Sequence, residues 1–292
     1  MDMTRSEAVA VRPADAKADD NGQSTLSQIL SRRESWASVL VFIVFLVAWE
    51  WLPGALGVPE FIIPSLSSVV AEFVRMLETE RMLFHTGITA AEVVIGFAVG
   101  SLLGMFIGYM LGISPTAEFV LSPYILALQI APKVAFAPLF VMWFGYTMYP
   151  KILVAVLIVF FPVMINVLGA VRTIDPQMIN LARSFSATRW QIFRKVEFPA
   201  SMPPLFAGLR IGSTLAVIGV VVGELVGGNT GLGYLLVFGE GQANTAMVFV
   251  VIFMLTVIGI IAYVAVILLE RRVLHYMPRR KLGIDTDQGG KS

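Results

Sequence analysis

GFAVGSLLGMFIGYMLG, residues 96–112, contains no charged side chain and places a glycine at every fourth position. An apolar run of this kind is typical of a helix that crosses a membrane. Glycines four residues apart lie on one face of a helix and let two backbones approach closely in lipid. The stretch predicts a membrane helix packed tightly against a neighbour, and a moving helix interface is the alternative use of the same smooth face.

Composition extends this prediction to the whole chain. Of its 292 residues, 57% are hydrophobic and only 14% are charged, whereas soluble domains carry about 25% charged residues. These values are typical of a polytopic membrane protein. The chain has no cysteine, which excludes disulfides, iron–sulfur clusters and thiolate zinc sites. Its two histidines, His85 and His275, are far apart in sequence, so a histidine-based metal centre is not expected.

The hydrophobic pattern predicts an all-α membrane protein with about six transmembrane helices. A hydrocarbon core about 30 Å thick takes about 20 helical residues to cross. The six predicted spans are residues 36–58, 87–113, 118–145, 151–171, 204–226 and 246–269. The third contains three prolines, Pro123, Pro132 and Pro138, so it is either one irregular span or a span followed by a separate short helix. The fifth repeats the glycine spacing at Gly208, Gly212, Gly219, Gly223 and Gly227.

The distribution of charge predicts the orientation in the membrane. Basic residues lie before the first span (Arg32, Arg33), between the fourth and fifth (Arg172, Arg183, Arg189, Arg194, Lys195, Arg210) and after the sixth (Arg271, Arg272, Arg279, Arg280, Lys281). Acidic residues outnumber basic ones between the first and second spans. Because cytoplasmic loops carry the excess of lysine and arginine, both termini and the stretch 173–203 are predicted to be cytoplasmic.

The chain divides into three parts on this basis. Residues 1–34 are polar and lack the features of a signal peptide, so we expect a disordered cytoplasmic tail. Residues 35–272 form the predicted transmembrane domain, and 273–292 a cytoplasmic C-terminal tail.

The stretch 173–203, called the insert below, has readable helix boundaries. Asp175 before Pro176 is a good N-cap pair, and Ser186 is a candidate helix break. Thr188 and Gln191 fit a capping box that opens a second helix, which is expected to end before Pro199. The sequence therefore predicts two short helices with a bend between them.

Three roles fit a basic, aromatic-bearing insert of this kind. It can lie on anionic lipid headgroups, or bind nucleic acid, which the surrounding membrane spans argue against. It can also dock a cytoplasmic protein, with small residues around Ser184, Ser186 and Ala187 at its tip.

The insert resembles the cytoplasmic loop of inner-membrane permease subunits of binding-protein-dependent ABC importers. That family's signature is Glu-Ala-Ala, three residues, Gly, nine residues, then Ile-x-Leu-Pro. Here it lands on residues 180–182 (Asn-Leu-Ala), Ser186 and 196–199 (Val-Glu-Phe-Pro), so Asn180 and Ser186 depart from the pattern. APLFVMWFG (137–145) and VVGELVGGNTGLGYLL (221–236) are similar to the nitrate, sulfonate and taurine branch, which also includes pyrimidine and riboflavin-type importers. The resemblance covers roughly residues 60–272.

This resemblance implies a type I, methionine-permease-like core in the bacterial cytoplasmic (inner) membrane. It implies a permease dimer surrounded by lipid, a separate ATPase dimer that binds ATP, and a periplasmic or lipid-anchored binding protein that delivers a small anionic or heterocyclic solute. Carried over to this chain, contact with the ATPase falls to Asn180, Ala182, Arg183, Phe185, Ser186, Ala187 and Pro199.

Glu92, Lys133 and Glu224 are ionisable residues that fall in or beside apolar runs. A charged group at bilayer depth costs about 3 kcal/mol on insertion scales, so each should face protein or water. Glu224, beside the glycine-rich stretch 227–235, is a candidate for an outer gate or for the binding-protein surface, or it pairs with a neighbouring helix. Lys133 either lines the path, pairs with a glutamate or extends towards the headgroups, and Glu92 is interpreted as structural.

The chain carries no pattern that indicates chemistry of its own. The glycine-rich stretch GGNTGLGYL (227–235) lacks the Gly-Lys-Ser/Thr ending of a phosphate-binding loop. No nucleophile–base pair or metal-ligand cluster is evident, so we expect neither an enzyme nor a bound cofactor or metal. The competing hypothesis is a secondary transporter driven by an ion gradient, which would have several buried acidic residues near mid-membrane and no need for a docking insert.

Overall fold

The computed structural model describes residues 20–79 and 81–276, with side chains from residue 36 to residue 275, and within them it contains only helices and their connections. Two compact units are distinguished, residues 1–67 and 68–292. The helices in order are α1 (Asp20–Ala55), α2 (Leu66–Thr79), α3 (Met82–Gly112), α4 (Pro115–Ile130), η1 (Lys133–Phe136), α5 (Ala137–Phe144), α6 (Met148–Arg172), α7 (Pro176–Ser184), α8 (Arg189–Ile192), η2 (Phe193–Glu197), α9 (Phe198–Gly227), α10 (Leu232–Gly241), α11 (Thr245–Val273) and η3 (Leu274–Tyr276).

The first unit consists of α1 and the turn that follows it. Trp49 donates its ring N–H to the Pro64 carbonyl at 3.0 Å, and the Glu50 carboxylate accepts from the backbone N–H and hydroxyl of Ser67 at 2.9 and 2.7 Å. These bonds fold residues 56–67 back onto the end of the helix. Residues 20–34, expected to be part of a disordered tail, are helical in the structure. Once a membrane helix is nucleated it extends at low cost through good helix formers such as those in 26–34. Residues 1–19 lie outside the described part of the chain.

The predicted membrane spans are confirmed as helices. Five helical stretches are long and apolar enough to cross a membrane: 36–55, α3, α6, the continuous run Arg189–Gly227, and α11. The proline-rich third span is broken, because α4 and the η1–α5 segment meet at an angle of 80°. This agrees with the prediction that the third span is irregular, and α4 and the η1–α5 segment together make up at most one broken span. The short helices α2 and α10 were not among the predicted elements.

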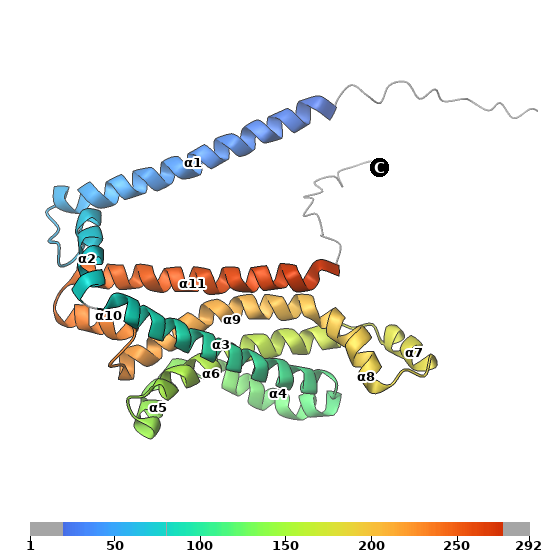
Figure 1. Ribbon diagram of the computed structural model, residues 1–292. Coiled ribbons are helices and arrows are strands. Elements are labelled where there is room, and N and C mark those ends of the chain that lie inside the picture. Colours follow the sequence, from blue (N-terminus) through green and yellow to red (C-terminus); the bar gives the residue numbers. More distant parts are fainter. Residues whose placement is uncertain (1–19, 80, 277–292) are drawn as a thin grey trace, which may run out of the picture. The chain divides into compact units, whose positions relative to one another are not determined.

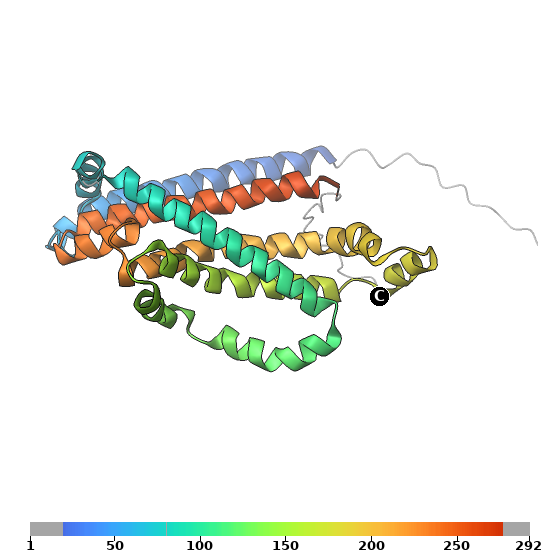
Figure 2. The same cartoon turned by 60° about the horizontal axis from the view of Figure 1, so that its bottom comes forward.

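The core of the second unit is a layer of three helices in which α6 packs against both α3 and α9, and Figures 1 and 2 show these helices running side by side. Nine glycines face α6, five on α3 (Gly96, Gly100, Gly104, Gly108, Gly112) and four on α9 (Gly208, Gly212, Gly219, Gly223). Gly227 at the end of α9 packs instead against Val141 of α5. A Cβ on Gly100 would lie 3.0 Å from the Val156 carbonyl oxygen, and a Cβ on Gly219 would lie 2.5 Å from the Ala155 Cα. The glycine stripes therefore allow backbone contact between helices, as predicted for tight packing in lipid.

Ion pairs add to this packing near the end of the bundle that carries the insert. Arg172 at the end of α6 pairs with Glu118 in the first turn of α4, and Arg210 of α9 lies 3.5 Å from Glu270 of α11. α7 and α8 lie at this end in Figure 1, and α5 and α10 lie at the opposite end of the same unit. The outward side chains of the spans are mostly aliphatic or aromatic, as expected for helices surrounded by hydrocarbon.

Candidate functional site

The first helix of the insert begins and ends as its sequence predicts. The Asp175 carboxylate accepts from the Gln177 backbone N–H at 2.8 Å and caps α7. At the other end, the backbone N–H of Ala187 donates to the Ala182 carbonyl at 3.1 Å, and that of Ser186 to the Arg183 carbonyl at 2.8 Å. This pair of reversed hydrogen bonds is a Schellman motif, which satisfies the last carbonyls of a helix.

Ser186 occupies the position in this motif where the chain must turn to the left-handed conformation. Its φ is 55°, a value that glycine adopts freely and that a residue with a Cβ adopts at a cost. Ser186 is also the position where the family pattern has glycine. The four-residue step from Ala182 to Ser186 therefore matches the step from the first carbonyl of a Schellman motif to its left-handed residue. Serine in place of the family's glycine keeps this bend but strains its backbone.

The second helix starts with the predicted capping box. The Thr188 hydroxyl accepts from the Gln191 backbone N–H at 3.3 Å, and the Gln191 side chain accepts from the Thr188 backbone N–H at 2.8 Å. The prediction that this helix ends before Pro199 is wrong, because α8 continues through the π-helical turn η2 into α9. A π-turn shifts the hydrogen-bond partner by one residue, and here the Phe198 N–H donates to the Phe193 carbonyl. This change of hydrogen-bonding register lets the helix continue into α9, whose second residue is Pro199.

The bend presents large apolar side chains to the surroundings. Phe185 is 80% exposed and Trp190 is 65% exposed, and Leu181, Met178 and Arg183 are also exposed. An exposed apolar patch rimmed by charge is a mark of an interaction surface. Six of the seven positions that the family resemblance assigns to ATPase contact lie together on α7 and the bend: Asn180, Ala182, Arg183, Phe185, Ser186 and Ala187. The seventh, Pro199, lies in the first turn of α9, at the base of the insert.

A buried polar cluster lies at the opposite end of the bundle, where α3 and α6 begin and α9 ends. Lys151 of α6 is 3% exposed, and its ammonium donates to the Glu92 carboxylate of α3 at 3.0 Å and to the Thr230 carbonyl at 3.0 Å. Glu92 is 2% exposed. The interpretation of Glu92 as structural agrees with this placement, since its charge is compensated by a neighbouring helix.

Glu224 belongs to the same cluster and holds the glycine-rich loop. It is 1% exposed, and its two carboxylate oxygens accept from the Thr89 hydroxyl at 2.7 Å and from the Gly233 N–H at 2.6 Å. The Thr89 hydroxyl oxygen in turn accepts from the Leu232 N–H at 2.8 Å. Gly231 has a φ of 106° and packs directly on the Glu224 carboxylate, which leaves no room for a side chain.

This cluster ties the loop 228–233 to α3, α6 and α9. Glu224 lies beside the glycine-rich stretch as expected, but it is buried within the chain and pairs with α3 through Thr89. Sequence reasoning missed Lys151, because it lies only four residues into α6, at the start of a predicted span. Two glutamates within predicted spans were the signal that could have identified it, since such charges need a partner inside the bundle.

Lys133 lies in η1, in the break between α4 and α5. Its ammonium donates to the Gln129 carbonyl of the preceding helix at 2.6 Å and lies 4.9 Å from the centre of the Phe161 ring. The lysine therefore satisfies a helix C-terminus and makes a cation–π contact. No hydrogen bond or ion pair among the described residues joins Lys133 to Glu224 or to the Glu92–Lys151 pair.

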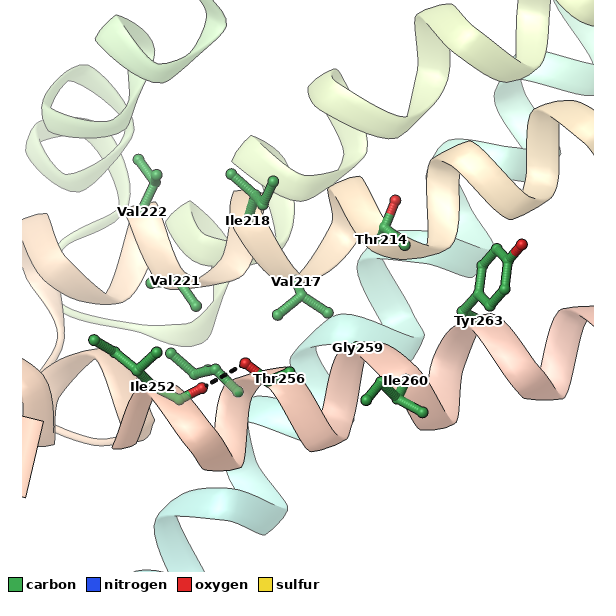
Figure 3. Close-up of a pocket in the computed structure, with 11 residues that line it drawn as sticks. Thr214, Val217, Ile218, Val221, Val222, Ile252, Thr256, Gly259, Ile260 and Tyr263 are labelled. Carbon is green, nitrogen blue, oxygen red and sulfur yellow. Dashed lines mark hydrogen bonds between the residues drawn. The ribbon is translucent and has the colours of Figure 1, made fainter. Parts of the chain in front are cut away.

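A groove of about 610 Å³ runs between α9 and α11, and Figure 3 shows the side chains that line it. The lining is mostly aliphatic. Its threonine hydroxyls are used within their own helices, Thr214 donating to Ile211 at 2.9 Å and Thr256 to Ile252 at 2.8 Å. A groove without charged or amide groups does not select a polar solute, so we do not assign it to the transport path. Within residues 20–79 and 81–276, no group of three histidine, aspartate or glutamate side chains is placed to hold a metal ion.

The chain is similar to membrane components of transport systems. Residues 100–275 match the family model described as the inner-membrane component of binding-protein-dependent transport systems. The riboflavin transport system permease RibX of Chloroflexus aurantiacus is 36% identical over 84% of this chain and 92% of its own length. The formylaminopyrimidine transport permease ThiX of Halalkalibacterium halodurans is 33% identical, covering 82% and 96%. The putative aliphatic sulfonates transport permease SsuC of Bacillus subtilis is 30% identical, covering 94% and 98%.

A solved structure shares the fold. The chain superposes on a chain of the MetNI methionine ABC transporter, in an inward-facing conformation, with a TM-score of 0.55. The match covers 66% of this chain and 95% of that chain at 20% identity. The predicted type I, methionine-permease-like core is confirmed at the level of the fold.

Proposed function

The chain belongs to the family of inner-membrane components of binding-protein-dependent transport systems, the ABC importer permeases, and from that premise we propose that it is the subunit that forms the path for a small solute and is driven by a separate ATPase. The single observation that carries the coupling proposal is the insert. It presents exposed aromatic side chains on a bend that is fixed by a Schellman motif on one side and a capping box on the other.

The insert has the properties of a rigid docking element. Both of its helix ends are satisfied by its own side chains and backbone, so its shape does not depend on a partner. Phe185 and Trp190 place apolar area at the tip, and aromatic anchors with basic neighbours are the usual centres of binding energy in interfaces. In this proposal ATP binds to the partner and not to this chain, which has no cofactor and performs no chemistry itself.

Solute movement then follows from displacement of the insert. The run Arg189–Gly227 is one continuous helical span from the second insert helix to the glycine-rich loop. A partner that closes on ATP and moves the bend therefore moves a helix that reaches the buried polar cluster. We assign the loop 228–233, held by Glu224, to the outer gate, with Lys133 as a residue at the path beside the break between α4 and α5.

We further propose that two copies of the chain pair through α4 and α5. α4 contributes no buried side chain within the described structure, and its exposed residues include Phe119, Tyr124 and Ile130. Trp143 on α5 is likewise exposed. An apolar face that the chain does not cover itself is suited to a second copy, which also encloses a path between the two.

The relatives support a proposal for the class of solute. The names of the three relatives specify riboflavin, a formylaminopyrimidine and aliphatic sulfonates, all small molecules with a polar or anionic group. We propose a solute of this kind, delivered by an outer binding protein that selects it.

The test is uptake into proteoliposomes that contain this chain with its co-purified ATPase and binding protein. Riboflavin, taurine, an alkanesulfonate and a formylaminopyrimidine are the probes, each with ATP inside and the membrane potential clamped to zero. Uptake of at least one probe that stops when ATP is withheld is the expected result. Uptake that persists without ATP and follows an imposed ion gradient would contradict the proposal and favour a secondary transporter.

A second arm tests the role of the insert. Phe185→Ala and Arg183→Ala remove an exposed anchor and an exposed charge from the bend, and ATPase co-purification should fall with each. Phe253→Ala is the matched control, because it removes an exposed aromatic side chain from α11, outside both the insert and the proposed pairing surface. ATPase association that survives both insert substitutions would show that docking occurs elsewhere.

A further inference from the structure

The insert joins the bundle at η2, and Glu197, the last residue of that turn, is a buried charged group there. Glu197 is 3% exposed. Its Oε2 accepts the Tyr109 hydroxyl of α3 at 2.6 Å, and its Oε1 lies 3.5 Å from Nη1 of Arg189, the first residue of α8. A short hydrogen bond from a hydroxyl to a carboxylate is among the stronger kinds in proteins. One side chain thus connects α3 to the helix that carries the bend.

Aromatic packing holds Tyr109 in this position. Its ring meets Phe193 edge-on with centroids 5.0 Å apart, and Phe193 also packs on Trp190 at 5.4 Å and on Phe198 at 5.6 Å. Three of these four rings belong to the insert side of the junction. The contact therefore consists of a directed hydrogen bond surrounded by apolar side chains, which limit access of water to it.

The junction would be a weak point without this contact. A π-turn interrupts the regular hydrogen bonding of a helix and often marks a functional site. A mostly apolar groove of about 260 Å³ lies against it, lined by α3 residues such as Met105 and Phe106 and by Met202 and Leu205 of α9. α3 and α9 are therefore not packed directly on each other at this level, where Gly108 holds α3 against Met164 and Val167 of α6. The Tyr109–Glu197 hydrogen bond is a direct link from α3 to the insert junction.

We propose that the Tyr109–Glu197 hydrogen bond makes α3 follow the insert, so that α3, α6 and α9 move as one body when the docked partner displaces the bend. Tyr109 and Glu197 are positioning residues in this scheme, because they touch neither the solute nor the partner. This inference rests on the proposed coupling function. It assigns to α3 a direct connection to the insert, in addition to the covalent continuity of α9.

The test measures distances within the assembled complex. The chain has no cysteine, so spin labels can be placed on Leu103→Cys in α3 and Lys195→Cys in η2, two positions whose native side chains are exposed. Doubly labelled chains are mixed with an excess of unlabelled chains before assembly, so that the intrachain pair dominates over pairs between the two copies. Distances are measured without nucleotide and with Mg·ATP plus orthovanadate. A sample with Lys195→Cys alone reports movement between the inserts of the two copies.

The expected result separates the two label pairs. The Lys195–Lys195 distance between copies should shift with nucleotide, while the Leu103–Lys195 distance within a chain stays the same. In Tyr109→Phe, which keeps the ring and removes only the hydroxyl, the intrachain distance should also shift with nucleotide. Glu197→Leu cuts the same bond from the other side and should give the same shift if Tyr109→Phe assembles poorly.

Two controls distinguish this role from general damage. Glu197→Gln keeps an acceptor for Tyr109 and should behave like the unmodified chain. Tyr263→Phe removes the same hydroxyl from α11 and should also leave the intrachain distance constant. An intrachain distance that stays constant in Tyr109→Phe and Glu197→Leu, or one that already shifts in the unmodified chain, would overturn the inference. If instead the inserts of the unmodified complex do not move and ATP drives no uptake, the proposed function itself fails.

Discussion

The effects of substituting single residues in this chain depend more on backbone conformation and burial than on side-chain chemistry. Ser186 has a φ of 55° at the end of α7, a conformation that costs about 1–2 kcal/mol for a residue with a Cβ. Lys151 and Glu92 form an ion pair in which each side chain is at most 3% exposed. Both positions lead to substitutions whose outcome can be stated in advance.

The substitution series at Ser186 tests the Schellman motif. Ser186→Gly and Ser186→Asn should keep ATPase association, because glycine and asparagine tolerate the left-handed region. Ser186→Val should weaken association, since a β-branched residue is a rare outlier there and the bend has to change. Co-purification of the ATPase at increasing salt measures the difference. Equal association of the valine and glycine variants would mean that the bend is not part of the docking surface.

The buried ion pair should respond in a non-additive way. Lys151→Met leaves the Glu92 carboxylate buried without its cation and should destabilise the fold by about 3–5 kcal/mol. Glu92→Leu combined with Lys151→Met should recover most of that loss, because both partners become apolar. Denaturant titration in detergent micelles, with exposed Lys195→Met as a control expected within about 0.5 kcal/mol of the unmodified chain, measures these values. A double variant as unstable as the single one would argue against the pairing.

At the scale of elements, the two glycine stripes decide how the helices meet. α6 presents valine and alanine side chains and backbone carbonyls to glycines on both sides, so α3 and α9 approach it more closely than helices with larger residues can. The same stripes in the sequence left open whether the face is static or moving. Contact on both sides of α6 indicates that these three helices form a single packed layer.

Two glycine-to-alanine substitutions with opposite surroundings test this layer. A Cβ on Gly104 would lie 2.7 Å from the Phe160 carbonyl oxygen, whereas a Cβ on Gly169 meets no atom within 4 Å. Gly104→Ala should lower the free energy of unfolding by about 1–3 kcal/mol, since α3 must move away from α6. Gly169→Ala should leave it unchanged or raise it by up to about 1 kcal/mol through helix propensity. An equal change in the free energy of unfolding in both variants would contradict this prediction.

How much of each element could be predicted follows from the range of the interactions involved. Hydrophobic runs and caps are local, so the spans, the Asp175 cap and the Thr188 capping box were readable from neighbouring residues. The passage of the helix through Pro199 was not, because it depends on a π-turn that no simple periodicity indicates. α2 and α10 are too short to span a membrane, so a search for apolar runs of membrane-spanning length does not find them.

The candidate sites show the same division. The residues 180–187 lie within one helix and its bend, so the pattern alone placed them together. The contacts of Lys151 with Glu92 and of Tyr109 with Glu197 join residues 59 and 88 positions apart. Such pairs depend on how the helices are arranged in space, which hydropathy and capping rules do not specify.

At the scale of the whole molecule, the two ends of the second unit differ in kind. One end carries the insert with its basic and aromatic surface, and the other carries the buried cluster around Glu224 and the short helix α10. The positive-inside rule assigns the insert to the cytoplasm. In this proposed orientation the opposite end faces outward, where the proposed binding protein would approach.

This orientation can be measured because the chain has no cysteine. Glu240→Cys on α10 and Arg194→Cys in η2 each place one thiol at an exposed position at opposite ends. A membrane-impermeant maleimide applied to spheroplasts should label the Glu240→Cys variant at once and the Arg194→Cys variant only after permeabilisation. Labelling in the reverse order would invert the proposed topology.

The π-turn at residues 193–197 also preserves a rotational phase. Such a turn holds one residue more than an α-helical turn, so the helices on either side of it keep nearly the phase that they would have without that residue. Wound as regular α-helix, the same extra residue would turn α8 and the bend by about 100° relative to α9. Phe185 would then point towards a different side of the bundle with its own helix unchanged. The direction in which this permease presents its docking surface therefore depends on a single turn that takes up one residue without passing on its rotation.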